Sequence, residues 1–217
     1  MKKKDKSFFA CSECGYQSVR WLGKCPDCGG WNTFIEEFQV TRNSGISKIS
    51  GPEKIHEIEV EKVSRIPTGI GEFDRVSGGG VVNGSLVLIA GEPGIGKSTL
   101  LLAIAGRLSS LGKKVLYISA EESKTQVKIR AERLKTSSDN LYLLCTTEMV
   151  SVKQALKNVN PDFAIVDSIQ TIFDSDIPST PGSVTQIREN ANFFLNYSKS
   201  SGCSVFLIGH ITKEGII

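Results

Sequence analysis

Short apolar runs and stretches of helical character alternate along the chain after about residue 85. The apolar runs are 86–90, 115–119, 141–145, 163–167 and 203–209. Apolar runs of this length, bounded by turn residues, are typical of buried strands. The stretches between them that are typical of helices are 99–105, 124–134, 152–159 and 183–197. Strands that alternate with helices in this way predict an α/β fold, with a mostly parallel sheet and helices on both of its faces.

The chain before this alternation has a different character. Residues 36 to about 62 show no clear periodicity and are rich in Asn, Ser, Gly and Pro, as is usual in a linker. From Arg65 onward the pattern becomes regular again, and a short helix is expected within 68–76. We therefore expect three parts, a small domain at 1–37, a linker at 38–62 and an α/β core at 63–217.

Composition and charge exclude several classes of protein. With 217 residues, of which 40% are hydrophobic, the chain is long enough for one medium domain and one small domain. A net charge of +3 is too small to argue for nucleic acid binding, and the lysines near the N-terminus also fit a solvated tail. No apolar run approaches the roughly 20 residues of a membrane span, and the start lacks the apolar segment of a signal peptide. We therefore expect a cytoplasmic protein without a membrane partner, whose cysteines serve a metal or the core.

The loop after the first apolar run has the spacing of a phosphate-binding P-loop. The segment Gly91–Ser98 fits G-x-x-x-x-G-K-[ST], with an expected strand before it and an expected helix after it. Small residues let backbone N–H groups surround a phosphate, and the helix N-terminus adds positive potential. Lys97 is expected to reach the β- and γ-phosphates of ATP, and Ser98 to ligate Mg²⁺. The residues expected to bind the nucleotide are Gly91, Glu92, Pro93, Gly94, Ile95, Gly96, Lys97, Ser98 and Thr99.

Carboxylates follow two of the other expected strands. Glu121 and Glu122 come just after 115–119, and Asp167 ends the run 163–167. Ligands bind at the carboxyl ends of strands in open α/β sheets. A glutamate in such a place orients or deprotonates an attacking water, and the aspartate helps to hold the Mg²⁺ shell. The alternative for Glu121 and Glu122 is that both begin the next helix, where negative charge is favourable.

Four of the six cysteines form two CxxC pairs near the N-terminus. Cys11 and Cys14 are followed, after a ten-residue spacer, by Cys25 and Cys28. Four thiolates at such a spacing are typical of a compact zinc ribbon, in which the metal supplies much of the folding free energy. A site of four thiolates also suits iron. Two further interpretations remain open, a pair of disulfides and a redox-active CxxC pair.

The segment with the cysteines also carries aromatic and basic residues. These are Arg20, Trp21, Lys24 and Trp31. They form either a surface that faces nucleic acid or a small core with ordinary surface charges, and the sequence leaves both interpretations open.

Several motifs together resemble one family of ATPases. They are the four-cysteine ribbon, Thr68-Gly69-Ile70-x-Glu72-Phe73-Asp74-Arg75-Val76, the three glycines at 78–80, and Gly-Glu-Pro-Gly-Ile-Gly-Lys-Ser-Thr-Leu-Leu-Leu from residue 91. From about residue 8 to its last residue, the chain is similar to bacterial RecA-type ATPases of DNA repair that begin with a zinc ribbon. The resemblance implies a RecA-type core in which Glu121 is the catalytic glutamate, Lys97 neutralises the phosphates and His210 senses the γ-phosphate.

The resemblance also indicates where DNA would lie. In RecA-type proteins a loop that corresponds to 173–182 faces a central DNA channel. Asp174 and Asp176 make this loop acidic, so it has no charge of its own with which to bind phosphates. Arg188, just beyond the loop, is the better candidate for a DNA contact.

The function that the resemblance implies is a DNA-dependent ATPase in recombinational DNA repair. Such an ATPase processes branched intermediates by branch migration on single-stranded DNA. Its implied partners are single-stranded or branched DNA and a recombinase filament, its assembly is a homo-hexamer, and its cofactors are ATP, Mg²⁺ and Zn²⁺. The alternative from another class is a zinc-containing adaptor that binds ATP with little turnover. A small-molecule kinase fits less well, because the ribbon has no role there.

The family has further parts that this chain does not reach by Ile217. They are the rest of the ATPase sheet, a Lys-Asn-Arg-Phe-Gly motif and a Lon-protease-like domain. We therefore expect the core to be truncated at its C-terminus and the chain to be a fragment or the product of a disrupted gene. Such a chain is expected to bind Mg·ATP but to hydrolyse it slowly, with Lys213 as the remaining cation near the site.

Overall fold

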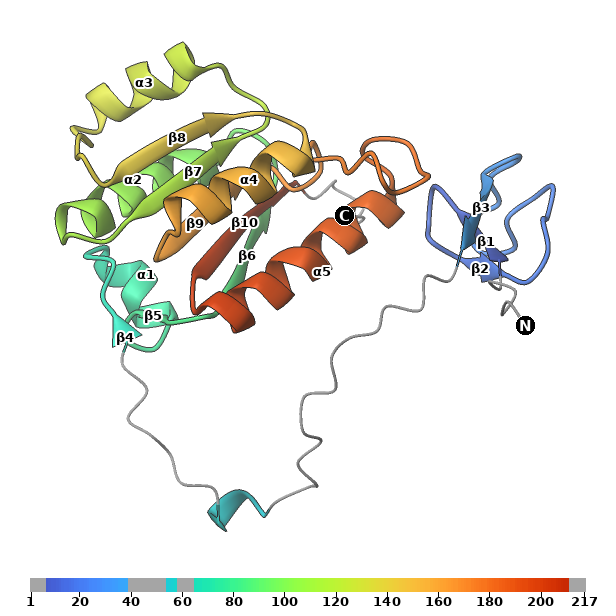
Figure 1. Ribbon diagram of the computed structural model, residues 1–217, viewed down its shortest axis with the longest axis horizontal. Coiled ribbons are helices and arrows are strands. Elements are labelled where there is room, and N and C mark those ends of the chain that lie inside the picture. The colour runs from blue at the N-terminus through green and yellow to red at the C-terminus, as the bar shows by residue number, and fades with distance from the viewer. Residues whose placement is uncertain (1–6, 39–53, 58–64, 211–217) are drawn as a thin grey trace. The chain divides into compact units, whose positions relative to one another are not determined.

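The computed structural model describes residues 7–38, 54–57 and 65–210 (Figure 1). The chain divides into two compact units, residues 1–64 and residues 65–217, and each unit is described by itself. The finer division into 1–37, 38–62 and 63–217 stays a proposal. Among the helices in the described residues, none has both the length and the apolar character that crossing a membrane requires.

The first unit contains a small antiparallel sheet. Its strands are β1 (Ser7–Cys11), β2 (Gln17–Ser18) and β3 (Phe34–Phe38), in the order β2-β1-β3. The buried cluster beside the sheet consists of Cys11, Cys25 and Phe34, with Phe9, Cys14 and Leu22 packed against it. A short 3₁₀ turn, η1 (Ile55–Glu57), lies farther along the chain. So small an apolar cluster cannot hold a domain together by burial alone.

The second unit is built on a five-stranded parallel sheet. Its strands are β6 (Leu86–Gly91), β7 (Val115–Ser119), β8 (Leu141–Cys145), β9 (Phe163–Asp167) and β10 (Ser204–His210). The strand order is β6-β10-β9-β7-β8, and all the pairs in this sheet are parallel. The expected α/β class and mostly parallel sheet are therefore confirmed.

Helices cover both faces of this sheet, as Figure 1 shows. They are α1 (Gly71–Val76), α2 (Lys97–Ser110), α3 (Lys124–Arg133), α4 (Met149–Val159) and α5 (Val184–Ser201). Side chains alternate across each strand, so Val115 and Tyr117 pack toward α2 and α3. Leu116 and Ile118 pack in the other core, with residues of α4 and α5. Two separate apolar layers thus fix the sheet from both sides.

A small hairpin leads into the sheet. Strand β4 (Arg65–Ile66) pairs with β5 (Val81–Val82), and helix α1 lies between them in sequence. Gly80 has φ 131°, and a Cβ added there would lie 2.5 Å from the carbonyl oxygen of Ile66. The last of the three glycines is therefore required by this close approach of two backbones.

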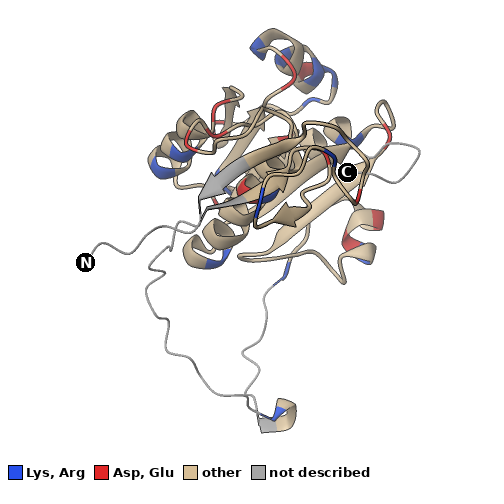
Figure 2. Cartoon of the chain, turned by 90° about the vertical axis from the view of Figure 1, so that its right-hand side faces the viewer, with Lys and Arg blue, Asp and Glu red and all other residues tan. Residues whose placement is uncertain are grey.

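Charged residues are concentrated on the helices and loops rather than in the sheet (Figure 2). Across the five strands of the parallel sheet, Asp167 is the only Asp, Glu, Lys or Arg. It is only 4% exposed. A buried carboxylate is costly unless partners stabilise it, so the end of β9 is a place where function is expected.

Candidate nucleotide site and four-cysteine centre

The P-loop connects β6 to α2 at the carboxyl end of the sheet. Gly94 and Gly96 have φ of 83° and 99°, a conformation that glycine adopts at little cost. A Cβ added to either residue would meet nothing within 4 Å. The loop therefore curves around space that no side chain of its own fills, which is the form that a phosphate cradle requires.

Helix α2 begins at this loop without a side-chain cap. Its N-cap is Gly96, which has no side chain to accept from the first backbone N–H groups. Helices α3 and α5, in contrast, are capped by Ser123 and Ser183, whose hydroxyls accept from backbone N–H groups. The N–H groups in the first turn of α2 thus lack the usual intramolecular acceptor. Ser98 and Thr99 lie in that turn, beside Lys97.

Lys97 lies over the P-loop and is only 7% exposed. Its Nζ donates to the carbonyl oxygens of Gly91 and Glu92, at 2.8 Å each. A Cβ added to Gly91 would lie 2.6 Å from Cδ1 of Ile95 and 3.9 Å from Cδ of Lys97. The side chains of Ile95 and Lys97 thus pack closely over Gly91, where the ammonium group of Lys97 is held by backbone carbonyls.

A chain of contacts links Lys97 to the expected catalytic glutamate. The Nζ of Lys97 lies 3.3 Å from Nδ1 of His210, and Nε2 of His210 lies 3.1 Å from Oε1 of Glu121. The hydroxyl of Ser168 donates to the same Glu121 oxygen. The strand order explains this meeting, because β10 lies between β6 and β9, and β7 is the next strand along. Residues distant in sequence therefore come together at one end of the sheet.

Asp167 is held by a tyrosine from the neighbouring strand. The hydroxyl of Tyr117 donates to Oδ2 of Asp167 at 2.7 Å, and both groups are buried. Burial, followed by the negative charge of Asp167, raises the pKa of Tyr117 well above its usual value. Tyr117 therefore stays a neutral donor. Sequence reasoning did not single it out, although a tyrosine in an otherwise aliphatic strand was a usable signal, because a buried hydroxyl needs a partner.

The two glutamates after β7 have different partners. Glu122 forms a half-buried ion pair with Arg130 of α3, whereas Glu121 faces His210 and Ser168. Helix α3 begins only at Lys124, and Ser123 with Gln126 forms its capping box. The interpretation that both acids begin the next helix is therefore wrong. Both precede it, and Glu121 alone belongs to the contact chain of the P-loop.

The loop that follows β9 is organised by one buried glutamine. Gln186 of α5 is 1% exposed, and its side-chain amide donates to the carbonyls of Asp174, Ile177 and Ser179. Asp174 also pairs with Lys153 at 2.6 Å. The expected loop at 173–182 is thus present and tied to α5, and part of its acidity is neutralised within the unit. Lys213 lies outside the described residues.

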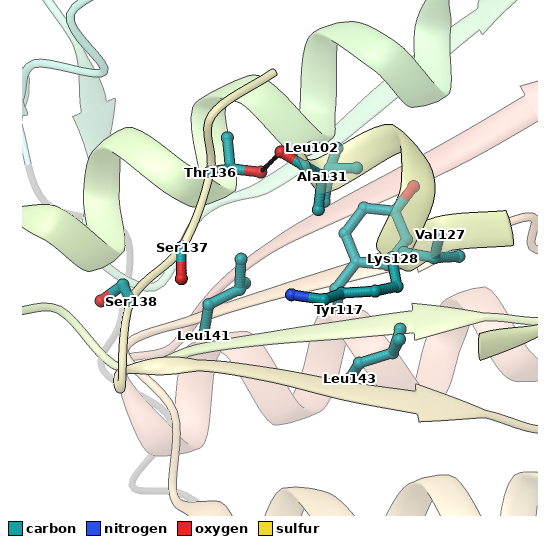
Figure 3. A pocket seen from close by; sticks show the side chains of 10 residues that line it. All are labelled: Leu102, Tyr117, Val127, Lys128, Ala131, Thr136, Ser137, Ser138, Leu141 and Leu143. Carbon is teal, nitrogen blue, oxygen red and sulfur yellow. Dashed lines mark hydrogen bonds between the residues drawn. The ribbon is translucent and has the colours of Figure 1, made fainter. Parts of the chain in front are cut away.

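A second hollow lies away from the P-loop, between α2, α3 and the strands β7 and β8. It has a volume of about 150 Å³ and is mostly apolar, and Figure 3 shows the side chains that line it. Its lining residues are Leu102, Tyr117, Val127, Lys128, Ala131, Thr136, Ser137, Ser138, Leu141 and Leu143. The ring of Tyr117 therefore lines this hollow, while its hydroxyl reaches Asp167. None of the expected nucleotide-binding residues lines it.

The four ribbon cysteines meet at one point. Their Sγ atoms all lie within 4.8 Å of one another, with 3.6 Å between Cys11 and Cys28 and 3.5 Å between Cys14 and Cys25. Four thiolates around zinc at about 2.3 Å are separated by roughly 3.8 Å, so the cluster fits the metal. All six cysteines of the chain are free, and the separations are far longer than a disulfide bond. The disulfide interpretation is therefore wrong.

The surroundings of Cys11 favour a thiolate. Burial acts to raise the pKa of this thiol, but hydrogen bonds with the Thr33 hydroxyl and with the backbone of Cys14 and Glu13 outweigh it and lower the pKa to about 6. A thiolate is the form that binds zinc. The same hydroxyl lies 3.1 Å from the Cys11 sulfur, so Thr33 is a supporting residue that the sequence did not reveal.

The two tryptophans of the ribbon are on its surface. Trp21 is 51% exposed and Trp31 is 70% exposed. Lys24 lies over the Trp31 ring, with its Nζ 5.7 Å from the ring centre. The interpretation of these residues as a small core is therefore wrong, because the buried cluster is made of cysteines and Phe34 instead.

Comparisons with known proteins agree with this arrangement. A family model described as KaiC, of the ATPase class, matches residues 66–144, and one described as the rubredoxin metal binding domain matches residues 9–36. The chain is 48% identical over 224 residues to the DNA repair protein RadA of Halalkalibacterium halodurans, and 47% identical over 222 residues to that of Bacillus subtilis. Each alignment covers 99% of this chain and 48% of the relative.

These matches extend over both units. The KaiC match ends before Asp167 and His210, so the grouping of these two residues with the P-loop rests on the geometry described above. The RadA protein of Listeria monocytogenes is 45% identical and aligns over 100% of this chain, again with 48% of its own length. The chain thus spans about half the length of the relatives that it matches. It belongs to the RadA family of RecA-type ATPases.

Proposed function

We propose that the chain binds Mg·ATP at the P-loop and hydrolyses it, and that this ATPase serves DNA repair. The observation that carries the proposal is the contact chain from Lys97 through His210 to Glu121, beside the buried Asp167. A phosphate-binding cation, a carboxylate able to take a proton and a carboxylate suited to a metal shell lie at one end of one sheet. This is the set of groups that ATP hydrolysis requires.

The roles follow from these positions. The backbone from Gly91 to Gly96 and the first turn of α2 surround the phosphates, and Lys97 neutralises them. Glu121 orients the attacking water and accepts its proton, as the water oxygen bonds to the γ-phosphorus and the bond to ADP breaks. Ser98 and Asp167 hold the Mg²⁺ shell, and bound Mg²⁺ neutralises charge on the phosphates. His210 contacts both Lys97 and Glu121. Through these contacts it senses whether a γ-phosphate occupies the P-loop and adjusts the position of Glu121, the catalytic base.

The zinc ribbon is proposed as a structural centre with Cys11, Cys14, Cys25 and Cys28 as ligands. Zinc in such a site links the two CxxC pairs and contributes folding free energy. Zinc is favoured over iron by the rest of the proposal, which includes no electron transfer.

DNA is the proposed partner, because the relatives are named as DNA repair proteins. The finer proposal is recombinational repair, with branch migration on single-stranded DNA by a homo-hexamer that works beside a recombinase filament. Arg188 of α5 is the proposed contact in the ATPase unit, since the preceding loop carries Asp174 and Asp176. A cytoplasmic location without a membrane partner is part of the same proposal.

One observation favours slow ATP hydrolysis by this chain and therefore supports a second candidate function. Within the described residues, Lys97 is the only cation that the structure joins to the contact chain. A second cation that stabilises the transferring phosphate is worth about 10³–10⁵ in rate where arginine fingers have been measured. An adaptor that binds ATP as a switch, with little turnover, is therefore the alternative.

The deciding experiment compares nucleotide binding and turnover in single variants of this chain. Lys97→Ala is expected to weaken Mg·ATP binding by about 10- to 150-fold, because a charge-assisted contact to phosphate is lost. Glu121→Gln is expected to keep the affinity and lower the hydrolysis rate by about 10²–10⁴. Calorimetry measures the first change and phosphate release measures the second. Lys128→Ala, which removes an exposed lysine of α3, serves as the matched control.

The outcomes separate the candidate functions. Equal affinity of the wild type and Lys97→Ala would contradict the nucleotide site itself. Normal affinity with no measurable hydrolysis in the wild type would favour the adaptor. Rapid turnover that rises strongly with single-stranded DNA would contradict slow hydrolysis by this chain and favour the DNA-dependent ATPase.

A further inference from the structure

The ribbon carries a second surface, separate from the metal ligands. We call it the indole face and define it as Arg20, Trp21, Gly23, Lys24 and Trp31. Both indoles are at least half exposed, while the buried cluster of the ribbon is complete without them. Exposed tryptophans that a fold does not need are characteristic of binding surfaces.

Backbone pairing holds the two indoles on the same side of the ribbon. Lys24 and Trp31 form an antiparallel bridge, and the N–H of Asn32 donates to the carbonyl of Gly23 at 2.9 Å. A Cβ added to Gly23 would lie 3.7 Å from ring atoms of Trp21 and 4.0 Å from a ring atom of Trp31. Gly23 thus lies between the two rings and adds no side chain there.

Positive charge accompanies the rings. Lys24 Nζ lies 5.7 Å from the centre of the Trp31 ring, and Arg20 is an exposed neighbour of Trp21 in the chain. Aromatic faces beside cations are the recurring arrangement on proteins that bind single-stranded nucleic acids, in which bases stack on rings and phosphates meet the cations. In a duplex the bases are already stacked on one another, so their faces are not available to the indoles. The ligand that fits this surface is therefore a single strand.

We propose that the indole face binds single-stranded DNA by stacking bases on Trp31 and Trp21. This rests on the proposed function for the choice of DNA, and it assigns the contact to the ribbon rather than to the ATPase unit. The loop 173–182 of that unit carries Asp174 and Asp176, so within the described residues the indole face is better suited to a strand. Lys24 then contacts a phosphate next to the stacked base.

The composition of the chain makes the test direct. The protein contains two tryptophans, both on this face, so intrinsic tryptophan emission reports on the indole face alone. Adding oligo(dT) to the full chain is expected to quench that emission in parallel with the binding of a fluorescently labelled oligo(dT), followed by anisotropy. Lys128→Ala is expected to show the same quenching, because it removes an exposed lysine of the other unit.

Variants at Trp31 separate stacking from general apolar contact. Trp31→Leu is expected to weaken oligo(dT) binding by about 5- to 150-fold, the range for loss of one stacked base. Trp31→Tyr keeps a planar ring and is expected to retain most of the affinity. Val19→Ala, at a residue that is 90% exposed on the same ribbon, is the matched control. Lys24→Gln is expected to lower the salt dependence by about 0.7 in the slope of log K against log salt.

The results distinguish this inference from the proposed function. Normal binding of labelled oligo(dT) with unchanged tryptophan emission would overturn the indole face as a DNA site and leave DNA binding to another region. Wild-type affinity in Trp31→Leu, with zinc content unchanged, would also overturn it and leave the indoles to a protein partner. No binding of oligo(dT) by the wild type would contradict DNA binding by this chain and the inference together.

Discussion

The two units of this chain keep their folds in different ways. The apolar cluster buried in the described part of the ribbon is small and consists of Cys11, Cys25 and Phe34, and the four sulfurs converge on one point. The ATPase unit buries two apolar layers on opposite faces of a sheet. Hence the ribbon depends on the identity of four residues, whereas the ATPase unit depends on a pattern spread over many. The two units also differ in where their large aromatic side chains lie. The ribbon leaves both tryptophans exposed, whereas the larger unit buries Phe163, Phe194 and Phe206.

The largest expected effect is loss of the ribbon on removal of one thiol. Cys25→Ser is expected to abolish metal binding and to unfold the ribbon, since structural zinc contributes on the order of 10 kcal/mol in small domains. Tryptophan emission should shift only slightly to the red, because both tryptophans lie in the ribbon and both are already at least half exposed. Helical circular dichroism should persist, because within the described residues α1 to α5 all lie in the second unit.

A cysteine outside the ribbon supplies the matched control. Cys145→Ser, at the end of β8, is expected to retain one metal per chain and the native emission. Metal analysis that finds neither zinc nor iron in freshly prepared, reduced wild type would contradict the metal centre. Loss of the helical signal in Cys25→Ser would show instead that the two units fold together.

The reverse experiment removes packing from the ATPase unit. Phe206 is fully buried, and its ring stacks on Phe163 with centroids 6.5 Å apart. Phe206→Ala is expected to lower the free energy of unfolding by about 3–5 kcal/mol, which lowers the melting temperature of this unit by about 10 °C. Thermal melts followed by helical circular dichroism measure the change. Leu88→Ala, at a residue of β6 that is 51% exposed, should cost far less.

The zinc ribbon is expected to survive Phe206→Ala at ordinary temperature. Metal content and tryptophan emission should both match the wild type. A loss of metal in Phe206→Ala as large as that in Cys25→Ser would contradict the independence of the two units. It would mean that the ribbon needs the ATPase unit for its own stability.

The sequence predicted the fold of the ATPase unit well, because its strands are continuous apolar runs. The expected strands at 115–119 and 141–145 match β7 and β8. The ends of the helices were predicted less accurately. Helix α4 begins at Met149 rather than at Val152, since its first turn pairs with the loop after β9 through the N–H of Met149 and the carbonyl of Phe173. Such a contact between distant segments has no signal in the local pattern.

The candidate site was predictable in its parts but not in its connections. The spacing of the P-loop and the acid at the end of β9 are local signals, and the family resemblance suggested Glu121 and His210. That His210 touches both Lys97 and Glu121 depends on β10 lying between β6 and β9, which strand propensity alone does not reveal. Their catalytic roles stay proposals until the variants are measured.

In the ribbon the site was easier to predict from the sequence than the packing. Its metal cluster was predicted from the spacing of two CxxC pairs, although disulfides and a redox-active pair also fitted that spacing. The position of Trp21 and Trp31 did not follow, since a tryptophan in so small a domain serves equally well as core or surface. The folded ribbon decides between the two, because Trp21 is 51% exposed and Trp31 is 70% exposed.

The smallest expected effect concerns one polar group inside the apolar ATPase unit. Tyr117→Phe removes the hydroxyl that donates to Oδ2 of Asp167 at 2.7 Å and leaves the ring in place. Loss of one such bond is worth about 1 kcal/mol, so the Mg²⁺ concentration for half-maximal ATP binding should rise about fivefold. The reason is that Asp167, only 4% exposed, loses the partner that orients it toward the metal shell. Calorimetry at fixed ATP and varied Mg²⁺ measures the shift, with Tyr142→Phe on the edge strand β8 as the matched control. A lower melting temperature with unchanged Mg²⁺ dependence would show that Tyr117 contributes to the stability of the ATPase unit and does not orient Asp167 for the metal. Burial would then account for the role of Tyr117, as it does for the two apolar layers.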